Sequence, residues 1–455
     1  MNIGSITKTN GFKVGVLIVL ILLFMIPLAM VQDIINERSR RSSGVEREIM
    51  ASWGGEFLTF GPILQIPCKT YETFTRRSEQ GDITQEIRET NFFLYIAPEE
   101  LNVEVLLGTE IKKRGIFSVP LFAGTVKLSG RFNPGKILKH LQDRREAFPE
   151  QAELFIALAD QRGIRGVETA EWNGGTIDFL PGMEGFASAE IQGGIHGAAS
   201  ANTEQMNYFN ISIAVQGGKS LKMTPLGEET AITVQADWTA PSFFGGYLPV
   251  SHRIEPSGFE AQWRISHLSR NIPLFWEGNG EFASAAMFGV NFYKPLDHYG
   301  LNTRAVKYSF LFIIIPFLSF FLFELFLRRS IHPVQYILAG IGNVIFYLLL
   351  ISFSERIPFS AAYWTSASAA TAMLTLYSAS LLGGWKNTPY IAGIMLLCYT
   401  FLYCTLQSED WALLIGSIGA FAVTGFVMFI TRKVDWYSGQ WAKPSAKPEG
   451  DEKEK

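Results

Sequence analysis

Six polar side chains interrupt or border apolar stretches in the last third of the sequence, and their types would allow proton or substrate handling. An ionisable group at membrane depth is costly unless it is paired or hydrated, so it commonly serves a function. The alternative is a structural network of hydrogen bonds between helices, which we favour. The six candidates are Glu324, Arg328, His332, Gln335, Asn343 and Glu355.

The spacing of these residues favours local, structural roles. Glu324 and Arg328 lie four residues apart on one helix face, where an ion pair would stabilise the helix. His332 and Pro333 are typical of a turn that ends one helix and begins the next. Asn343 lies in the middle of an apolar stretch, so it must find a partner within a helical bundle.

The long region of mixed polarity before these stretches carries no recognisable catalytic motif. The histidines are scattered and no His-Glu-x-x-His segment occurs, so we expect no metal site. No Gly-x-Ser-x-Gly segment or P-loop is present. We interpret Ser242 as a turn residue, although His252 nearby leaves an envelope hydrolase as an alternative. We therefore expect no catalytic residue, no cofactor and no enzymatic activity.

Charge and cysteine content exclude further classes. The chain has 39 Lys and Arg against 42 Asp and Glu, and no basic run with interleaved aromatic residues. This composition gives no reason to expect nucleic-acid binding. Cys68 is the only cysteine in the region of mixed polarity, so no disulfide bond can form within that region.

Six apolar stretches must position the polar candidates. A hydrocarbon core of about 30 Å requires about 20 helical residues for each crossing. The first stretch is longer than the apolar core of a cleaved signal peptide, so we interpret it as a retained anchor. We predict one N-terminal anchor helix and a five-helix C-terminal bundle. The stretches are Val14–Val31, Tyr308–Leu327, Val334–Phe353, Ala361–Leu382, Pro389–Leu406 and Trp411–Thr431.

The distribution of basic residues predicts the orientation. Cytoplasmic loops carry an excess of Lys and Arg close to the ends of spans. Lys13, Lys386 and Arg432 lie in segments that fall on one side when the six spans are threaded in order. We therefore predict that both termini are cytoplasmic and that the long inserted region is periplasmic.

Strand patterns dominate the inserted region. Apolar and polar residues alternate over Val126–Phe132, Ile232–Trp238 and Phe259–Ile265, and Gly-rich turns separate such runs. Period-two alternation places one set of side chains in a core and the other in water. We predict a mainly antiparallel β domain built as one sandwich or two. Helices are expected over Glu37–Trp53, extending the first span, and over Lys136–Ala147.

These patterns divide the chain into four parts. The cytoplasmic N-terminus and first helix occupy residues 1–32, and the periplasmic β domain occupies residues 33–304, with a soft boundary between two possible lobes at 133–150. Helices two to six occupy residues 305–431. Residues 432–455, which are mostly polar at their end, are expected to form a disordered cytoplasmic tail.

Several short segments resemble sequence motifs of a known family. They are Gly61–Pro67, Pro241–Pro249, Gly258–Trp263, Phe323-Glu324, Arg329–Tyr336, Phe346–Leu350, Ser354-Glu355 and Asp435–Tyr437. In this order they resemble the CreD family of bacterial inner-membrane proteins, also called colicin-E tolerance proteins. The resemblance runs from the first apolar stretch to Tyr437, which is nearly the whole chain.

The resemblance implies a location and a process. Proteins of this family are associated with envelope integrity and stress responses, and the resemblance implies no catalytic activity or ligand. We therefore expect a non-enzymatic protein in the lipid bilayer, whose periplasmic domain binds an envelope component or another inner-membrane protein. The alternative is a transporter or lipid-handling protein that uses the polar groups of the bundle. The sequence shows no inverted repeat of broken helices, which weighs against a secondary transporter.

Overall fold

The computed structural model describes residues 10–77, 83–139, 145–182, 193–278, 286–292, 298–327, 331–381, 384–408, 411–432, 434–435 and 440–441. Two compact units make up the chain. A helical unit contains Met1–Arg41 and Leu296–Lys455, and a β unit contains Ser42–Pro295.

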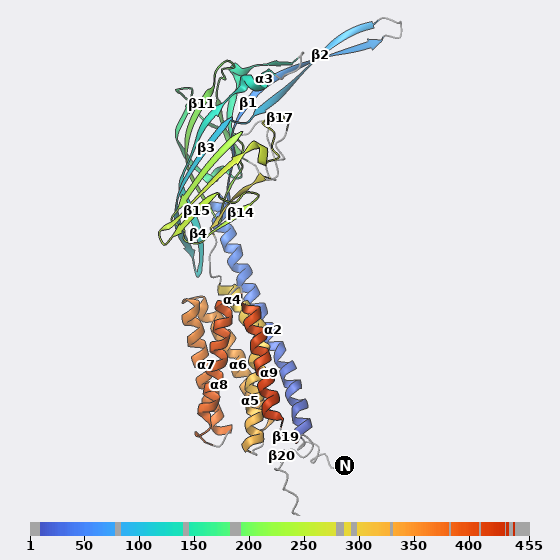
Figure 1. Ribbon diagram of the computed structural model, residues 1–455, viewed down its shortest axis with the longest axis vertical. Coiled ribbons are helices and arrows are strands. Elements are labelled where there is room, and N and C mark those ends of the chain that lie inside the picture. Colours follow the sequence, from blue (N-terminus) through green and yellow to red (C-terminus); the bar gives the residue numbers. More distant parts are fainter. Residues whose placement is uncertain are drawn as a thin grey trace, which may run out of the picture. The chain divides into compact units, whose positions relative to one another are not determined.

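The helical unit begins with helix α2 (Asn10–Ser52), which runs on into the β unit, so the predicted extension of the first span beyond residue 37 is confirmed. Five further helices lie close to the predicted stretches (Figure 1): α5 (Ser309–Leu327), α6 (Pro333–Ser354), α7 (Phe359–Leu381), α8 (Thr388–Gln407) and α9 (Ala412–Thr431). Helix α4 (His298–Lys307) was not predicted, because most of its residues were assigned to the β domain, whereas they belong to the helical unit. Strands β19 (Val434–Asp435) and β20 (Gln440–Trp441) pair within the predicted tail.

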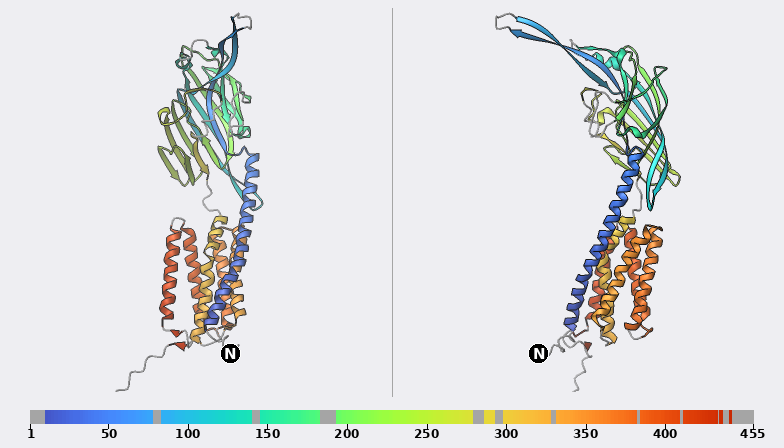
Figure 2. Two further views of the ribbon diagram at one scale, coloured as in Figure 1. Left: turned by 90° about the vertical axis from the view of Figure 1, so that its right-hand side faces the viewer. Right: turned by 180° about the vertical axis from the view of Figure 1, so that it is seen from behind.

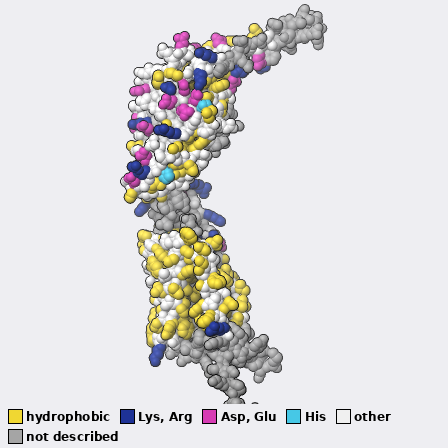
Figure 3. All heavy atoms as spheres, in the orientation of Figure 1, with side chains coloured by type: hydrophobic (Ala, Val, Ile, Leu, Met, Phe, Trp, Pro, Cys, Tyr) yellow, Lys and Arg dark blue, Asp and Glu magenta, His cyan; other side chains and the backbone are white. Residues whose placement is uncertain are grey.

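Hydrophobic side chains cover most of the helical unit's visible surface, whereas charged side chains of both signs are scattered over the β unit (Figure 3). Among the described residues, α2, α6, α8 and α9 are each long and apolar enough to cross a membrane. Helices α4 and α5 together would form a fifth span with a 46° bend. Helix α7 is not among them, because serine and threonine lower its hydropathy. Six crossings therefore remain a prediction.

The β unit consists of two sheets that lie face to face (Figure 2). In the first sheet the order is β14-β18-β12-β1-β6-β10-β9, with β2, β5 and β17 attached beside β1 and β2. Its strands are β1 (Phe57–Arg77), β2 (Ile83–Ile96), β5 (Arg145–Ala147), β6 (Glu153–Leu158), β9 (Leu180–Pro181), β10 (Gly193–Ala198), β12 (Ser220–Met223), β14 (Pro241–Gly245), β17 (Phe275–Glu277) and β18 (Phe288–Phe292).

The second sheet has the order β15-β16-β13-β3-β4-β11-β7-β8. Pairing is antiparallel throughout both sheets except between β1 and β12 and between β3 and β13, so the mainly antiparallel prediction is confirmed. Its strands are β3 (Glu100–Arg114), β4 (Phe117–Phe132), β7 (Ile164–Trp172), β8 (Gly175–Thr176), β11 (Asn207–Gly218), β13 (Glu229–Ala236), β15 (Ser251–Glu255) and β16 (Gly258–Ser266).

One hydrophobic core lies between the sheets. Leu64 and Phe155 of the first sheet belong to the same buried cluster as Val103, Leu128 and Val234 of the second. The alternating patterns put these side chains inward, because successive residues of a strand point to opposite faces. Since the cluster includes residues from both sides of 133–150, the two sheets form one sandwich.

The predicted helix over Lys136–Ala147 is wrong at its C-terminal end. Among the described residues of this segment, only those of α3 (Pro134–Leu138) are helical, and the side chain of Asn133 caps this helix by accepting a hydrogen bond from the amide of Lys136. Arg145–Ala147 instead pairs with Cys68–Thr70 as strand β5. Pairing with the long strand β1 outweighs the local helical pattern at this position.

The two ends of the second sheet have different surroundings. At one end, Arg114 of β3 forms an ion pair with Glu48 of α2 (2.6 Å) and Lys112 lies 4.4 Å above the ring of Trp53. At the other end β3 begins with Glu100, which pairs in register with Glu229, the first residue of β13. Strand β3 spans roughly 45 Å between these ends at about 3.3 Å for each residue.

Candidate functional site

A cleft of about 390 Å³ opens at the end of the second sheet that lies farthest from α2. Two parallel strands, β3 and β13, bring a Glu-Glu pair each to this cleft. The amide of Glu228 donates to the carbonyl of Pro98 (2.9 Å), and the amide of Glu229 donates to that of Glu99 (3.0 Å). The lining residues are Glu99, Glu100, Asn102, Arg131, Glu228, Glu229, Thr230, Ala231 and Arg264.

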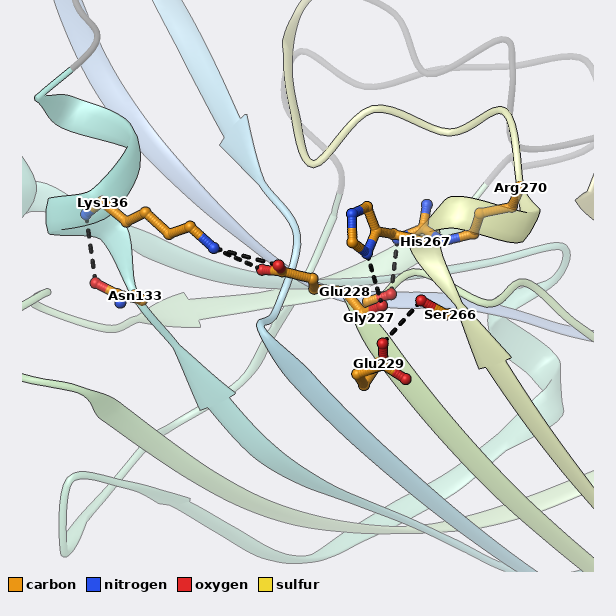
Figure 4. A network of polar contacts seen from close by, with 8 residues as sticks. All are labelled: Asn133, Lys136, Gly227, Glu228, Glu229, Ser266, His267 and Arg270. Atoms are coloured by element: carbon orange, nitrogen blue, oxygen red, sulfur yellow. Dashed lines mark hydrogen bonds and ion pairs between the residues drawn. The ribbon is translucent and has the colours of Figure 1, made fainter.

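Three of the four carboxylates have partners. Lys136, from α3, points toward Glu228, and its Nζ lies 2.9 Å from Oε2 (Figure 4). Arg131 Nη2 lies 3.5 Å from Glu100 Oε2, and Ser266 Oγ donates to Glu229 Oε1 (2.8 Å). The hydrogen bond with Glu228 raises the pKa of Lys136. The cleft is therefore lined by charges of both signs.

A buried arginine holds the loop that carries Glu228. Arg270 is 8% exposed, and its Nη2 donates to the carbonyls of Leu226 (2.5 Å) and Gly227 (2.7 Å). The amide of His267 donates to the carbonyl of Glu228 (2.8 Å), as Figure 4 shows. Burial lowers the pKa of Arg270 to about 10, so the side chain stays charged at neutral pH. The hydrogen bonds from Arg270 and His267 thus hold the loop that carries Glu228 in place.

Two buried polar atoms of the cleft lack a hydrogen-bond partner among the described residues. They are Oε2 of Glu99 and Nε of Arg131. Their residues are neighbours, because the amide of Glu99 donates to the carbonyl of Arg131 (2.9 Å). Leaving a buried donor or acceptor unsatisfied costs about 1–3 kcal/mol, and more when it is charged. Both atoms are shielded from solvent, so this cost falls on the folded protein itself.

The predicted polar residues of the helical unit lie in separate clusters. Glu324 is 7% exposed, forms an ion pair with Lys13 of α2, and accepts a hydrogen bond from Tyr336 of α6 (3.1 Å). The partner predicted for it, Arg328, lies outside the described residues. The observed partners come from two other helices, so Glu324 joins α2, α5 and α6.

His332 and Gln335 act on the start of α6. The Nδ1 of His332 accepts from the amide of Val334 (3.3 Å), and the Oε1 of Gln335 accepts from the amide of His332 (2.9 Å). This reciprocal arrangement satisfies amides that a helix start leaves without an internal partner. Both side chains therefore have a local structural role.

Asn343 compensates for a proline in the neighbouring helix. It is 1% exposed, and its Nδ2 donates to the carbonyl of Phe312 (2.5 Å). That carbonyl would normally accept from the amide four residues on, but this residue is Pro316, which has none. The Oδ1 of Asn343 accepts from the hydroxyl of Tyr399 (3.1 Å). The partner expected within the bundle is thus found on α5 and α8.

Glu355 belongs to the opposite end of the helical unit from Glu324. It accepts from the hydroxyl of Tyr299 (3.1 Å) and lies 3.9 Å from Nε of Arg38. Lys13 and Arg38 are 25 residues apart on α2, which corresponds to about 37 Å of helix. That length lies between the thickness of the hydrocarbon core and that of a whole bilayer, about 30 and 45 Å.

Polar residues on one face of α6 connect these clusters. Tyr336, Asn343, Tyr347 and Ser354 are buried and recur at helical spacing. Tyr336 and Asn343 have the partners given above, and Ser354 accepts from Asn302 Nδ2 (2.9 Å). The hydroxyl of Tyr347 is buried without a partner in the described part of the chain. Most of the stripe is therefore satisfied by contacts between helices.

Sequence reasoning missed residues that act through distant partners. Lys13 was considered only as a topology signal, and the two Glu-Glu pairs were not singled out. One sequence signal could have located the cleft: a Glu-Glu pair stands at the start of two strands in which apolar and polar residues alternate. The two pairs are Glu99-Glu100 and Glu228-Glu229.

Ser242 is not a turn residue, because it lies in strand β14 opposite Asn291, where pairing with β18 fixes it. His252 packs against the ring of Phe243 (centroids 5.4 Å apart), and no hydrogen bond joins it to Ser242 among the described residues. The part of the chain that the structure describes contains no group of three His, Cys, Asp or Glu side chains able to hold a metal ion.

The fold defines an integral membrane protein that combines apolar helices with a large β unit. The sequence pattern of the family described as "Inner membrane protein CreD" matches residues 9–437. The chain therefore belongs to the CreD family of inner membrane proteins, as its sequence motifs predicted. It is 31% identical over 434 residues to the inner membrane protein CreD of Escherichia coli (strain K12), a match that covers 94% of each chain.

A comparison with solved structures adds little. The M1 zinc metallopeptidase from Deinococcus radiodurans is similar with a TM-score of 0.24 and 9% identity, over 43% of this chain and 41% of that chain. A similarity of this size carries no argument about fold or function.

Proposed function

We propose that this protein is a non-enzymatic binding protein of the cell envelope, supporting envelope integrity under stress. In this proposal the β unit lies in the periplasm and binds an envelope component at the cleft, while the helical unit anchors it in the inner membrane. Both termini are cytoplasmic, as the positions of Lys13, Lys386 and Arg432 favour. The partners are the lipid bilayer and an envelope component or another inner-membrane protein.

The cleft is the observation that carries this proposal. It is open, its charged side chains come from separate segments, and Arg270 fixes the loop behind Glu228 before any ligand binds. Fixed polar groups in a concave site favour binding, because little further ordering is needed. The interior of the sandwich is filled by the core cluster, so the described residues favour a surface site over a lipid chamber.

Transport through the helical unit is the second candidate function. The buried hydroxyl of Tyr347 favours it, because an unpaired polar group at this depth invites a water molecule or a substrate. Tight packing argues against a path, since a Cβ added at Gly340 would lie 2.4 Å from the ring of Phe24. Transport predicts that Tyr347→Phe abolishes function at an unchanged protein level, whereas the binding proposal predicts nearly normal function.

Filling the cleft tests the binding proposal. Ala231 lines the cleft from the outer face of β13, so Ala231→Trp would occupy it without changing any charge. The control is Gln235→Trp, on the same face of the same strand but outside the cleft. We expect only Ala231→Trp to fail to restore envelope-stress resistance to a deletion strain at equal protein level. Full restoration by Ala231→Trp would exclude the cleft as the functional site.

A further inference from the structure

We propose that the outer parts of β1 and β2 form a self-association surface, on which a second copy of this chain pairs with the open edge of β2. This inference goes beyond the proposed function, because it concerns a part of the β unit that does not line the cleft. The segments involved are residues 71–77 of β1 and residues 83–93 of β2, which we call the arm.

The arm is a ribbon of two strands with no third strand beside it among the described residues. Its strands pair in one register as far as Arg77 and Ile83. Strand β5 lies beside β1 only at residues 68–70, and β17 lies beside β2 only at residues 94–96. The arm projects from the rest of the β unit (Figure 1, Figure 2). An isolated two-stranded hairpin is only marginally stable in water, so a further strand would stabilise the arm.

The open edge of β2 lacks several features that usually prevent pairing between copies. Edge strands are commonly protected by short length, lysine, proline or a β-bulge. Residues 83–93 contain no lysine, proline or glycine, and their register with β1 has no shift. The edge strand β15, in contrast, has five residues and lies between Pro249 and Pro256. The edge of β2 can therefore pair with another strand.

The sequence of this edge is complementary to itself about Ile87. In two antiparallel strands related by a twofold axis, residues at equal distances before and after the centre lie opposite each other. Opposite charges and threonine pairs at such positions stabilise antiparallel strands, whereas like charges destabilise them. This pattern favours a second copy over an unrelated strand. The opposed residue types are Glu86 with Arg88, Gln85 with Glu89, and Thr84 with Thr90.

The described side chains near this centre are available for pairing. Ile87 is apolar and yet 68% exposed. Arg88 is exposed and forms no ion pair with a described residue, although Glu72 lies opposite it on β1. Glu89 lies 2.8 Å from Lys69, so its charge is already compensated. Pairing between copies would cover Ile87 and bring an acidic residue of the other copy opposite Arg88.

Membrane anchoring makes a small interface sufficient for this association. Only residues 84–90 of each copy pair in this arrangement, so the buried surface is smaller than in a standard stable complex. Both copies belong to the same inner membrane, which raises their effective concentration. The complex is therefore a weak homodimer, with strands in the order β1-β2-β2-β1.

Oxidative cross-linking of the full-length protein in its membrane tests this arrangement. Ile87→Cys places a thiol of each copy at the twofold centre, where Cα atoms about 4.5–5.5 Å apart allow a disulfide bond. The matched control is Thr73→Cys, because Thr73 is exposed and lies opposite Ile87 on β1. The two Thr73 positions would be three strand spacings apart, about 14 Å, which is too far for a disulfide bond. Both variants also carry Cys404→Ser, because Cys404 is exposed whereas Cys68 and Cys398 are buried.

The two cysteine variants separate the possible outcomes. We expect Ile87→Cys to give at least about tenfold more cross-linked dimer than Thr73→Cys. More dimer from Thr73→Cys would overturn the proposal in favour of pairing through β1. Equal yields would indicate random collision and would also overturn it. No dimer from either variant would exclude a second copy as the partner of the arm.

Charge reversal at Arg88 gives a second, independent result. Arg88→Glu brings like charges together with Glu86 in both opposed pairs, so the yield of the Ile87→Cys dimer should fall about tenfold. Adding Glu86→Arg restores opposite charges between the copies, so the yield should recover. The double variant still has an acidic residue opposite Glu72 within each copy, so recovery cannot come from a repaired ribbon. A double variant with as little dimer as Arg88→Glu would overturn the proposal.

Discussion

The helical unit and the β unit both bury polar groups, but they differ in how those groups are satisfied. In the helical unit, Glu324, Asn343 and Glu355 each find a protein partner on another helix. In the cleft of the β unit, Glu99 and Arg131 keep buried atoms without a partner among the described residues. The comparison teaches that burial of a polar residue does not by itself mark a binding site. Tyr347 of the helical unit also lacks a partner among the described residues, so a missing partner does not mark a binding site by itself either.

The Lys13–Glu324 ion pair gives the largest expected effect on the helical side of this comparison. Glu324→Leu leaves the ammonium of Lys13 without its carboxylate, and removal of one partner of a buried pair costs about 3–5 kcal/mol. Because Lys13 is partly exposed, we expect the free energy of unfolding in detergent to fall by about 3 kcal/mol.

The double variant Lys13→Met/Glu324→Leu is the control for this prediction. It removes both charges together, so most of the lost stability should return. A double variant as unstable as Glu324→Leu would mean that the pair does not act as a structural contact.

Asn343 offers a smaller and more selective test. Asn343→Leu leaves the carbonyl of Phe312 unsatisfied, so the free energy of unfolding should fall by about 2 kcal/mol. In a Pro316→Ala background the helix regains the amide that bonds to this carbonyl, so the same substitution should cost less. Equal costs in both backgrounds would contradict the proposed compensation between Asn343 and Pro316.

Arg270 tests the β side of the comparison. Arg270→Lys keeps the positive charge but loses the planar fork that reaches the carbonyls of Leu226 and Gly227. We expect the free energy of unfolding to fall by about 1 kcal/mol, because the loop carrying Glu228 is less fixed. Chemical denaturation of the two proteins side by side measures this difference. Equal stability of both proteins would show that the planar fork of Arg270 does not hold this loop.

Asp160 gives the smallest effect, and it depends on pH. Hydrogen bonds from the side chain of Arg162 lower the pKa of Asp160, so the carboxylate stabilises the fold above its unfolded pKa of about 3.9. This contribution is lost as the pH falls through the lowered folded pKa. Below about pH 4 the stability of the natural protein should therefore fall more steeply than that of Asp160→Asn. The pair is largely exposed, so the difference is small, and parallel slopes would contradict it.

Much of the fold was predictable because its signals are local. Alternation over Ile232–Trp238 predicts which side chains of β13 enter the core, and Val234 is fully buried. The apolar stretches predicted where the helices of the helical unit lie. The error at Arg145–Ala147 arose because a short segment took its structure from pairing with β1, far away in the sequence.

The sites were predictable only in part, because their partners lie far apart along the chain. The polarity and depth of Asn343 predicted that it needs a partner, but not that Phe312 and Tyr399 supply it. Lys13 and Glu324 are 311 residues apart, and no periodicity connects them. The cleft depends on parallel pairing of β3 with β13, which joins segments from different thirds of the chain.

Rescue of a deletion strain by two variants compared side by side tests the central claim most directly. Ala231→Trp fills the cleft, and Lys13→Met/Glu324→Leu replaces the buried ion pair of the helical unit by apolar side chains. At equal protein level, we predict that the cleft variant fails to restore envelope-stress resistance and that the ion-pair variant restores it. Restoration by the cleft variant together with failure of the ion-pair variant would contradict the account, and would move the functional site to the helical unit.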